Sequence, residues 1–279
     1  MTVLARTRGE LGAALPAGAP VAVVMTMGAL HEGHAALMRE ARRRLPQSRI
    51  VVTDFVNPTQ FGPGEDFARY PRTLEADIEV CQRNGVDVVF APSVDEVYGA
   101  SGLGITVDPG PRGGILEGAS RPGHFAGVLT VVAKLLHLTG PDIALFGEKD
   151  YQQLVLIRDM VRALDFPVEV IGVPTVREAD GLAMSSRNRY LSAEARRRAS
   201  AIPLALERGG AAARDGVDAA VDATRAALAT SGFAIDYVVV TDVDLGAPVN
   251  GGPGRLLVAV RVDDTRLIDN APIEIGEGA

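Results

Sequence analysis

The sequence predicts an α/β protein in which a large parallel-sheet domain is followed by a smaller α+β domain. Short apolar runs, each long enough for a buried parallel strand, occupy residues 21–24, 50–56, 86–90, 141–146 and 168–173. Several of these runs lead through a turn into an amphipathic helix. This alternation indicates a doubly wound, Rossmann-like parallel sheet.

The composition limits the classes of function. The chain of 279 residues has a net charge of −7 and a pI near 5.2, which argues against a nucleic-acid partner. The longest apolar stretch, 127–138, contains Lys134 and is too short to span a membrane. The N-terminus has no apolar region typical of a signal peptide, and a single cysteine excludes an internal disulfide. We therefore expect a cytoplasmic protein without a membrane partner, with Cys81 in the core beside Leu74 and Ile78.

The first candidate site is the turn at residues 25–34, M-T-M-G-A-L-H-E-G-H, between the strand at 21–24 and a helix. The start of a helix offers unpaired N–H groups and the positive end of the helix dipole, so it binds anions. His31 and His34 can both donate hydrogen bonds to phosphate oxygens. A tight turn with two surface histidines is the alternative. Because two of the four histidines lie here, we favour a triphosphate site.

Polar side chains also follow the second strand. Asn57 and Gln60, in N-P-T-Q-F-G at 57–62, suit a substrate with hydroxyl or carboxylate groups. The alternative is a turn-forming Asn and an exposed Gln. Tyr70, in an irregular link at 66–72, either lines a pocket or packs against its neighbours, and the second reading is favoured on sequence alone.

A helix over 73–84, closed by Gly85, precedes a Gly- and Pro-rich loop at 99–123. Residues 105–107 are a candidate strand in this loop. Arg121 and His124 stand at the end of the loop, before a helix over 126–138, and a solvated loop is the alternative for both. Loops of this length in a compact domain are often functional.

A second strand-to-helix corner is G-E-K-D-Y-Q-Q at 147–153. Lys149 and Asp150 lie at the start of a helix, where a lysine opposes the helix dipole but adds to an anion site. Gln153 lies one turn further on and could reach the same pocket. We therefore interpret this corner as a second part of the phosphate site.

A turn at Met184, Ser185, Ser186 and Arg187 can close over phosphates, with the arginine bidentate. Ser192 is expected to cap the next helix. Beyond it, Ala-rich helices at 193–208 and about 216–230 precede three short β runs. These runs are 235–240, 255–262 and 266–268. We place the domains at 1–174 and 175–279.

Together the motifs resemble the pantoate–β-alanine ligase (pantothenate synthetase) family of the HxGH nucleotidyltransferase superfamily. The resemblance rests on these stretches, in the family's order: T-M-G-A-L-H-E-G-H, N-P-T-Q-F, R-P-G-H-F, G-E-K-D-Y-Q-Q, D-G-L-A-M-S-S-R-N-R-Y-L-S and R-L-I-D-N. It covers nearly the whole chain. One departure is Met25, which stands where the family usually has Pro.

The resemblance implies a two-step reaction, in which pantoate and ATP form pantoyl adenylate and pyrophosphate, and β-alanine then displaces AMP. It implies ATP contacts at Met27, Gly28, Ala29, Leu30, His31, Glu32, Gly33, His34, Gly147, Glu148, Lys149, Asp150, Val176, Met184, Ser185, Ser186 and Arg187. Gln60 is expected to contact pantoate and β-alanine, and Gln153 to contact pantoate. We add Asn57, Tyr70 and Arg121 as candidate substrate contacts.

A carboxylate is already ionised at pH 7, so the first step needs positioning and charge neutralisation rather than a base. We assign these tasks to His31, His34, Lys149 and Arg187, with Mg²⁺ on the ATP phosphates. The family's proton donor falls on His34, which we interpret partly as a hydrogen-bond donor to phosphate. We expect no direct protein ligand to the metal, with Asp150 nearby. The family also implies a homodimer and a C-terminal lid.

Two other functions stay open at this point. One is an adenylyl or cytidylyl transferase of the same superfamily, which would stop at a nucleotide-linked product. The other is a catalytically silent nucleotide sensor on the same fold. Retention of both histidines, Lys149 and Arg187 argues against the sensor.

Overall fold

The computed structural model describes residues 1–277 and divides into two compact units. The N-terminal unit comprises residues 1–148 and 152–174, and the C-terminal unit comprises residues 149–151 and the chain from Thr175 onward. None of the helices in the described chain has the length and apolar character needed to cross a membrane.

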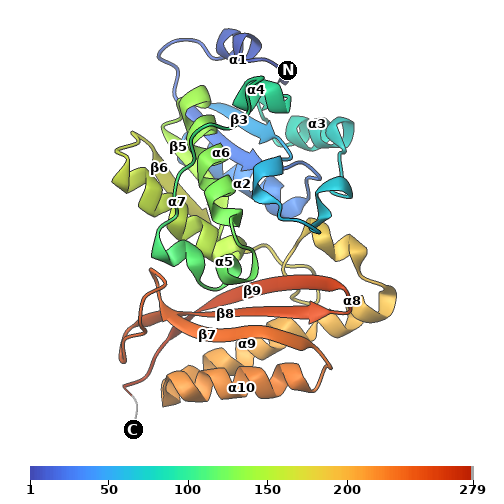
Figure 1. The fold of residues 1–279 in the computed structure, drawn as a ribbon, viewed down its shortest axis with the longest axis vertical. Coiled ribbons are helices and arrows are strands. Elements are labelled where there is room, and N and C mark those ends of the chain that lie inside the picture. The colour runs from blue at the N-terminus through green and yellow to red at the C-terminus, as the bar shows by residue number, and fades with distance from the viewer. Residues whose placement is uncertain (278–279) are drawn as a thin grey trace. The chain divides into compact units, whose positions relative to one another are not determined.

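The N-terminal unit is built on a six-stranded sheet in the order β1-β4-β3-β2-β5-β6, in which every neighbouring pair is parallel (Figure 1). The strands are β1 (Val3–Ala5), β2 (Val21–Thr26), β3 (Arg49–Asp54), β4 (Val88–Phe90), β5 (Ile143–Gly147) and β6 (Glu169–Val173). The predicted parallel sheet is confirmed, although the short edge strand β1 was not predicted.

The candidate strand at 105–107 is wrong. This stretch belongs to no strand of either sheet. The N–H of Val107 instead donates to the Thr130 hydroxyl at 2.9 Å, so a helix side chain takes the place of a sheet partner.

Helices cover both faces of the sheet, because successive residues of the central strands, which point to opposite faces, are both buried. The face that contains Val21 and Val23 packs against α1 (Arg8–Ala14), α4 (Val94–Tyr98), α6 (His124–Thr139) and α7 (Tyr151–Ala163). The face that contains Ala22 and Val24 packs against α2 (Glu32–Arg44) and α3 (Leu74–Arg83). Cys81 is fully buried in this second core, as predicted.

The sheet order creates a topological switch point. From β2 the chain first adds β3 on one side, and later adds β5 on the other side of β2. The loops after β2 and β5 therefore leave the carboxyl ends of these strands in opposite directions. In open α/β sheets ligands bind at the carboxyl ends of the strands, at such a point.

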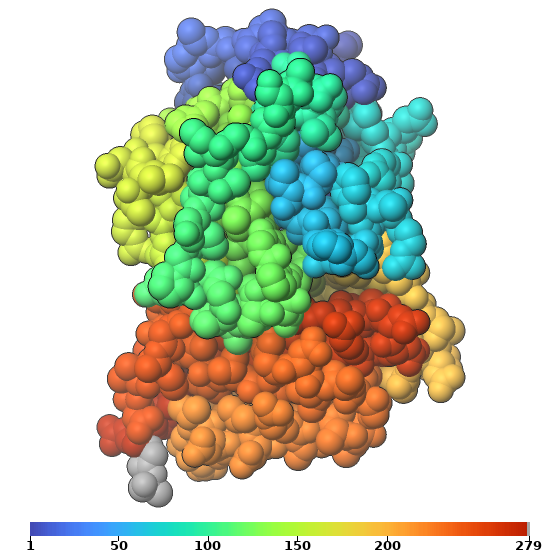
Figure 2. Space-filling view, viewed as in Figure 1, coloured from blue at the N-terminus to red at the C-terminus, as the bar shows by residue number. Residues whose placement is uncertain are grey.

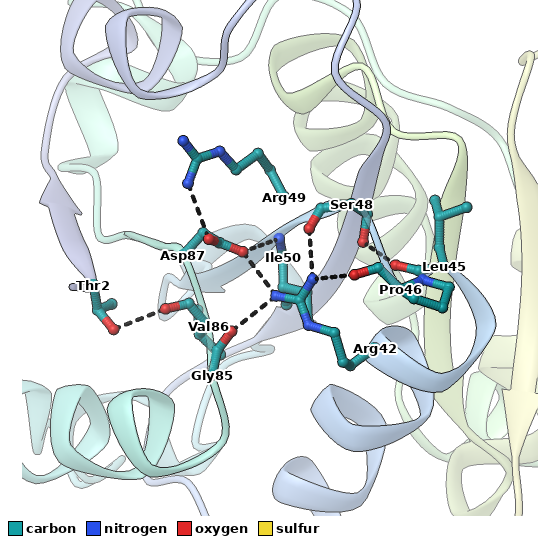
Figure 3. A network of polar contacts seen from close by, with 10 residues as sticks. All are labelled: Thr2, Arg42, Leu45, Pro46, Ser48, Arg49, Ile50, Gly85, Val86 and Asp87. Carbon is teal, nitrogen blue, oxygen red and sulfur yellow. Dashed lines mark hydrogen bonds and ion pairs between the residues drawn. The ribbon is translucent and has the colours of Figure 1, made fainter.

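At the other end of the strands, a polar network stabilises the amino ends of β3 and β4 (Figure 3). The Arg42 guanidinium, from α2, donates to the carbonyls of Ser48 at 2.7 Å and Gly85 at 3.0 Å, and to the Asp87 carboxylate at 3.0 Å. Asp87 also accepts the N–H of Ile50 at 2.9 Å. These bonds hold the amino ends of β3 and β4 together, away from the switch point.

Residues 99–123 run along the surface of the N-terminal unit (green in Figure 2) and include α5 (Glu117–Ser120) and a 3₁₀ turn at Pro111–Gly114. The buried Gln152 side chain on α7 fastens this loop. It donates to the carbonyls of Arg112 and Ile115, both at 2.8 Å, and accepts the N–H of Glu117 at 2.9 Å.

The C-terminal unit is α+β, as predicted. Its antiparallel sheet, in the order β7-β8-β9, consists of β7 (Ala234–Asp242), β8 (Pro253–Val262) and β9 (Thr265–Glu274). The helices α8 (Ala193–Ala199), α9 (Ala201–Ala212) and α10 (Val217–Ala229) share its apolar core (Figure 1). The last strand is longer than the predicted 266–268. The prediction ended too early because Asp269, Asn270 and Pro272 interrupt the apolar pattern. Pro272 is tolerated because β9 is an edge strand.

Candidate active site

The turn between β2 and α2 uses its two histidines as helix caps. His31 is the N-cap residue of α2, and its Nδ1 accepts the N–H of Gly33 at 3.1 Å. Nδ1 of His34 accepts the N–H of His31 at 3.3 Å, and the two ring centroids lie 4.2 Å apart. Because each Nδ1 accepts a hydrogen bond, a neutral ring carries its proton on Nε2. A neutral imidazole at either position therefore carries an Nε2–H group.

Hydrogen bonds to the side chains of Thr26 and Asp77 fix the backbone just before His31. Gly28 has φ +78° and donates to the Thr26 hydroxyl at 3.1 Å. The N–H groups of Ala29 and Leu30 donate to the carboxylate of Asp77, at 3.0 and 2.7 Å. Asp77 was not predicted as a site residue, because an acidic residue in the first turn of a helix is common for reasons of helix stability alone.

The turn after β3 is buried, so the exposed Gln60 of the alternative is wrong, whereas Asn57 does form the turn, because its Oδ1 accepts the N–H of Thr59 at 3.3 Å. Asn57 is 1% and Gln60 8% exposed. The Asn57 amide donates to Gln60 Oε1 at 3.1 Å and to the Gly127 carbonyl at 3.2 Å, and its Oδ1 accepts the Tyr98 hydroxyl at 2.7 Å. Gln60 Nε2 lies 3.0 Å from the sulfur of Met27. The two loops at the carboxyl ends of β2 and β3 are thus in contact.

Arg121 and His124 are also ordered, which excludes the solvated-loop alternative. The Arg121 guanidinium donates to both carboxylate oxygens of Glu65, at 2.8 and 2.7 Å. Burial opposes ionisation of Glu65, but the bonds from Arg121 hold the pKa of its carboxyl below the ordinary value. Nε2 of His124 lies 3.0 Å from Arg121 Nη1, and its Nδ1 lies 2.8 Å from the Gln60 carbonyl oxygen.

The protonation state of His124 follows from these partners. Burial, aided by the charge of Arg121, lowers the pKa of His124 to about 4. A neutral ring with its proton on Nδ1 donates to the Gln60 carbonyl and accepts from Arg121 at Nε2, which satisfies both contacts. The array of Glu65, Arg121 and His124 therefore fixes the backbone of Gln60.

The two remaining candidates of the N-terminal unit are Tyr70 and Gln153. Tyr70 is 7% exposed, and its ring meets Phe61 edge-on with centroids 5.9 Å apart, so it packs as favoured. Gln153 is half-buried in the first turn of α7, whereas its neighbour Gln152 is committed to the 99–123 loop. Substrate contacts at these residues stay predictions.

Lys149 and Asp150 lie in a 3₁₀ turn, Glu148–Asp150, that leads into α7. Lys149 Nζ is 3.5 Å from Asp150 Oδ1, and the Lys149 carbonyl accepts the Asn270 amide at 2.9 Å. Asn270 in turn accepts the Nε–H of Arg255 at 2.7 Å. The Arg255 guanidinium stacks 4.0 Å from the centre of the Tyr151 ring. These contacts set the course of the backbone around Lys149.

The segment from Val176 to Arg187 folds back on itself. The N–H of Met184 donates to the Val176 carbonyl at 2.9 Å, and Ser185 Oγ accepts the N–H of Arg187 at 3.2 Å. Arg177 holds this fold by donating to both carboxylate oxygens of Asp269, at 2.7 and 3.0 Å. The candidates Val176, Met184, Ser185 and Arg187 are thereby brought together.

Asp269 and Asn270 had no predicted role, although R-L-I-D-N was noted as a motif. Both are nearly fully buried, and they hold Arg177 and the Lys149 carbonyl respectively. Two polar residues inside a β run were the signal that could have identified them. Ser192 caps α8 through the N–H of Ala195 at 3.1 Å, as predicted.

Comparison with known proteins is decisive for the family. The family model described as pantoate-beta-alanine ligase matches residues 3–272. The chain belongs to the pantoate–β-alanine ligase family. The pantothenate synthetase of Salinispora arenicola strain CNS-205 is 56% identical over 280 residues, covering 99% of each chain.

Solved structures of pantoate–β-alanine ligases agree. The crystal structure of the pantothenate synthetase from Thermus thermophilus is 50% identical, with a TM-score of 0.90, covering 97% of this chain and 99% of that one. The Francisella tularensis pantoate–β-alanine ligase, described as complexed with β-γ ATP and β-alanine, is 33% identical, with a TM-score of 0.81 and 97% of each chain covered. The family, the fold class and the ligase class predicted from the motifs are confirmed.

Met25 is the residue at which the sequence departs from the expected family motif. Met25 aligns with Thr53 in the parallel pairing of β2 with β3, and the pairing continues to Thr26. The residue therefore extends the strand up to the turn that bears the histidines.

Proposed function

We propose that this chain joins pantoate to β-alanine through a pantoyl adenylate. A pantoate carboxylate oxygen attacks the α-phosphorus of ATP, and the bond to pyrophosphate breaks. The β-alanine nitrogen then attacks the acyl carbon, AMP leaves with the bridging oxygen, and the amine loses a proton to solvent. Membership of the ligase family supports this reaction, as does the relative from Francisella tularensis described with an ATP ligand and β-alanine.

The observation that carries the proposal is the pair of imidazoles at the switch point. Their Nδ1 atoms are engaged in capping α2, so their Nε2–H groups are oriented donors for an anion. The N-terminus of α2 adds its own partial positive charge. Preorganised donors of this kind stabilise the charge that develops on phosphate oxygens in the transition state. No general base is needed, because the attacking carboxylate is ionised at pH 7.

Lys149 and Arg187 complete the proposed nucleotide site as cations. The ATP contacts would be Met27, Gly28, Ala29, Leu30, His31, Glu32, Gly33, His34, Gly147, Glu148, Lys149, Asp150, Val176, Met184, Ser185, Ser186 and Arg187. The bonds from Arg177 to Asp269 and from Met184 to Val176 stabilise one backbone conformation of the segment from Val176 to Arg187, which provides five of these contacts.

The acid substrate is assigned to the buried turn after β3. The Gln60 side chain would bind pantoate and β-alanine, with Asn57 fixing its amide. Gln153 and Tyr70 are the other proposed contacts. Arg121 is proposed to act at this site, where its bonds to Glu65 fix its guanidinium.

Mg²⁺ is proposed to enter with ATP. Residues 1–277 contain no cluster of three or more His, Cys, Asp or Glu side chains that could hold a metal. Mg²⁺ is commonly held by substrate phosphates, waters and one or two carboxylates. Asp150, half exposed and next to Lys149, would be the nearest carboxylate. Bound Mg²⁺ would neutralise phosphate charge.

The proposal includes a lid role for the domain from residue 175 and a homodimer, which the family resemblance implies, and a cytoplasmic location, which the single cysteine favours. Sedimentation velocity at micromolar concentration tests the dimer. A single species near the 29.3 kDa of one chain would contradict it.

The experiment is a pyrophosphate-release assay with ATP, Mg²⁺ and D-pantoate. His34→Ala and Lys149→Ala should each lower the rate about 10²-fold or more, the scale of losing an oxyanion donor. His137→Ala is the matched control, because His137 is exposed and stacks on Phe166 with ring centroids 4.9 Å apart. Near-wild-type release from either site variant would refute the assignment. Pyrophosphate release without any AMP release when β-alanine is present would favour a nucleotidyl transferase instead.

A further inference from the structure

Two carboxyl groups meet beneath the histidine-bearing turn. They belong to Asp54, the last residue of β3, and Asp77, in the first turn of α3. A Cβ atom placed on Gly28 would lie 2.5 Å from Asp54 Oδ1 and 3.3 Å from Asp77 Oδ2. The two groups therefore approach each other directly under the backbone at Gly28. A hydrogen bond between two carboxyl groups requires that one of them carries a proton.

The surroundings of the two groups indicate which one is protonated. Asp77 accepts hydrogen bonds from the N–H groups of Ala29 and Leu30 and from the Thr73 hydroxyl, at 2.7 to 3.0 Å. Three donors stabilise a carboxylate. Asp54 Oδ2 is buried without a hydrogen-bond partner, which strongly disfavours a charge there. The proton therefore belongs on Asp54, which donates to the Asp77 carboxylate.

We propose that Asp54 and Asp77 share one proton and act as positioning residues for the backbone at 28–30, so that the turn loosens when Asp54 ionises. The effect on catalysis rests on the proposed function, since it requires this turn to bind ATP. The pairing itself does not depend on that function, because every contact that supports it lies within the N-terminal unit.

The ionisation falls in the neutral range. Burial, followed by the charge of Asp77 and the hydrogen bond to it, raises the pKa of Asp54 to about 7. The ionisable side chains that act on Asp54 come from α3, namely Asp77 and Cys81. Burial and the two carboxyl groups raise the pKa of the Cys81 thiol to about 12, so it stays neutral. From the turn above, Gly28 presents only backbone. Above pH 7 two carboxylates would face each other there, and their repulsion opposes the contacts of Asp77 with Ala29 and Leu30.

The catalytic test compares the KM for ATP at pH 6 and pH 9 in the wild type and in Asp54→Asn. An asparagine keeps an N–H for Asp77 and cannot ionise. We expect the wild-type KM to rise about tenfold with pH, the effect of a coupling worth one pKa unit. The Asp54→Asn value should stay within about twofold of the wild-type value at pH 6. The titration of ATP itself is common to both proteins and cancels. The exposed Asp95→Asn is the matched control and should follow the wild type.

Asp77→Asn separates positioning from ionisation. It replaces one of the two oxygens that accept from Ala29 and Leu30 with an NH2 group, so the KM for ATP should be raised at both pH values, with kcat changed less. An Asp54→Asn variant that keeps the wild-type pH dependence of KM would overturn the proposal.

A second measurement needs neither nucleotide nor activity. In the nucleotide-free wild type, carbon-13 NMR of the aspartate carboxyl groups should show one resonance titrating near pH 7 that disappears in Asp54→Asn. In Asp77→Asn that resonance should titrate at least one unit lower. If Asp54 titrates near its ordinary value, the pair does not share a proton and the inference fails. A protein that passes this test but forms no pantothenate would contradict the proposed function and leave the pair intact.

Discussion

His124→Ala tests whether the array of Glu65, Arg121 and His124 positions the acid substrate. The substitution removes the donor that lies 2.8 Å from the Gln60 carbonyl in a buried site. A buried acceptor left without its partner costs about 1–3 kcal/mol. Arg121 Nη2 lies 3.4 Å from the same oxygen and can partly replace the bond. We therefore take the lower half of the range, which corresponds to about a tenfold effect.

The assay is steady-state pantothenate synthesis with each substrate varied in turn. In His124→Ala, kcat/KM for pantoate should fall about tenfold, and the KM for ATP should change by less than threefold. His124→Asn places an amide N–H near the position of Nδ1, so it should restore most of the loss. An unchanged kcat/KM for pantoate in His124→Ala, or a His124→Asn enzyme that is no better, would refute the positioning role.

The same residue predicts a pH dependence of stability. The folded pKa of His124, about 4, lies below the ordinary value of about 6.5. Between these values the unfolded chain binds a proton that the folded protein does not, so the wild type loses stability as pH falls from about 6.5 to 4. The loss attributable to His124 is about 3 kcal/mol. In urea unfolding, the stability of the wild type relative to His124→Asn should fall by about this amount between about pH 6.5 and pH 4, and parallel curves would contradict it.

Two further variants test the contacts around the proposed nucleotide and acid sites. Asn270→Ala removes the hydrogen bond to the Lys149 carbonyl, so pyrophosphate release should fall about tenfold through a misplaced lysine, and an unchanged rate would exclude this route. Gly127→Ala would bring a Cβ to 2.2 Å from the Thr59 carbonyl oxygen, so thermal unfolding should show a loss of about 1–3 kcal/mol. Gly114→Ala is its control, because that Cβ meets nothing within 4 Å; equal effects of the two alanines would contradict the close packing.

Local patterns predicted the parallel strands and the two strand-to-helix corners. The short apolar runs and the glycine-containing turns are local signals, and the Lys149 corner and the His31 corner were both visible in this way. The short edge strand β1 was not predicted, because its three residues show too little periodicity. The end of β9 was not predicted, because Pro272 interrupts its apolar pattern.

Contacts between distant segments could not be read from spacing. Glu65 and Arg121 lie 56 residues apart, and Asp77 lies 47 residues from Leu30. Glu65, Arg121 and Asp77 are of residue types that usually lie on the surface, and only the fold shows their partners. The buried turn at Asn57 also required the structure, because Asn and Gln are polar residues that turns usually expose.

The central claim is that the pantoate carboxylate attacks the α-phosphorus of ATP. Pantoate labelled with oxygen-18 in its carboxylate tests this claim directly, with the released AMP analysed by mass spectrometry. We predict one oxygen-18 atom in each AMP formed together with pantothenate. Unlabelled AMP, or oxygen-18 found in inorganic phosphate with ADP as the other product, would contradict the adenylate route.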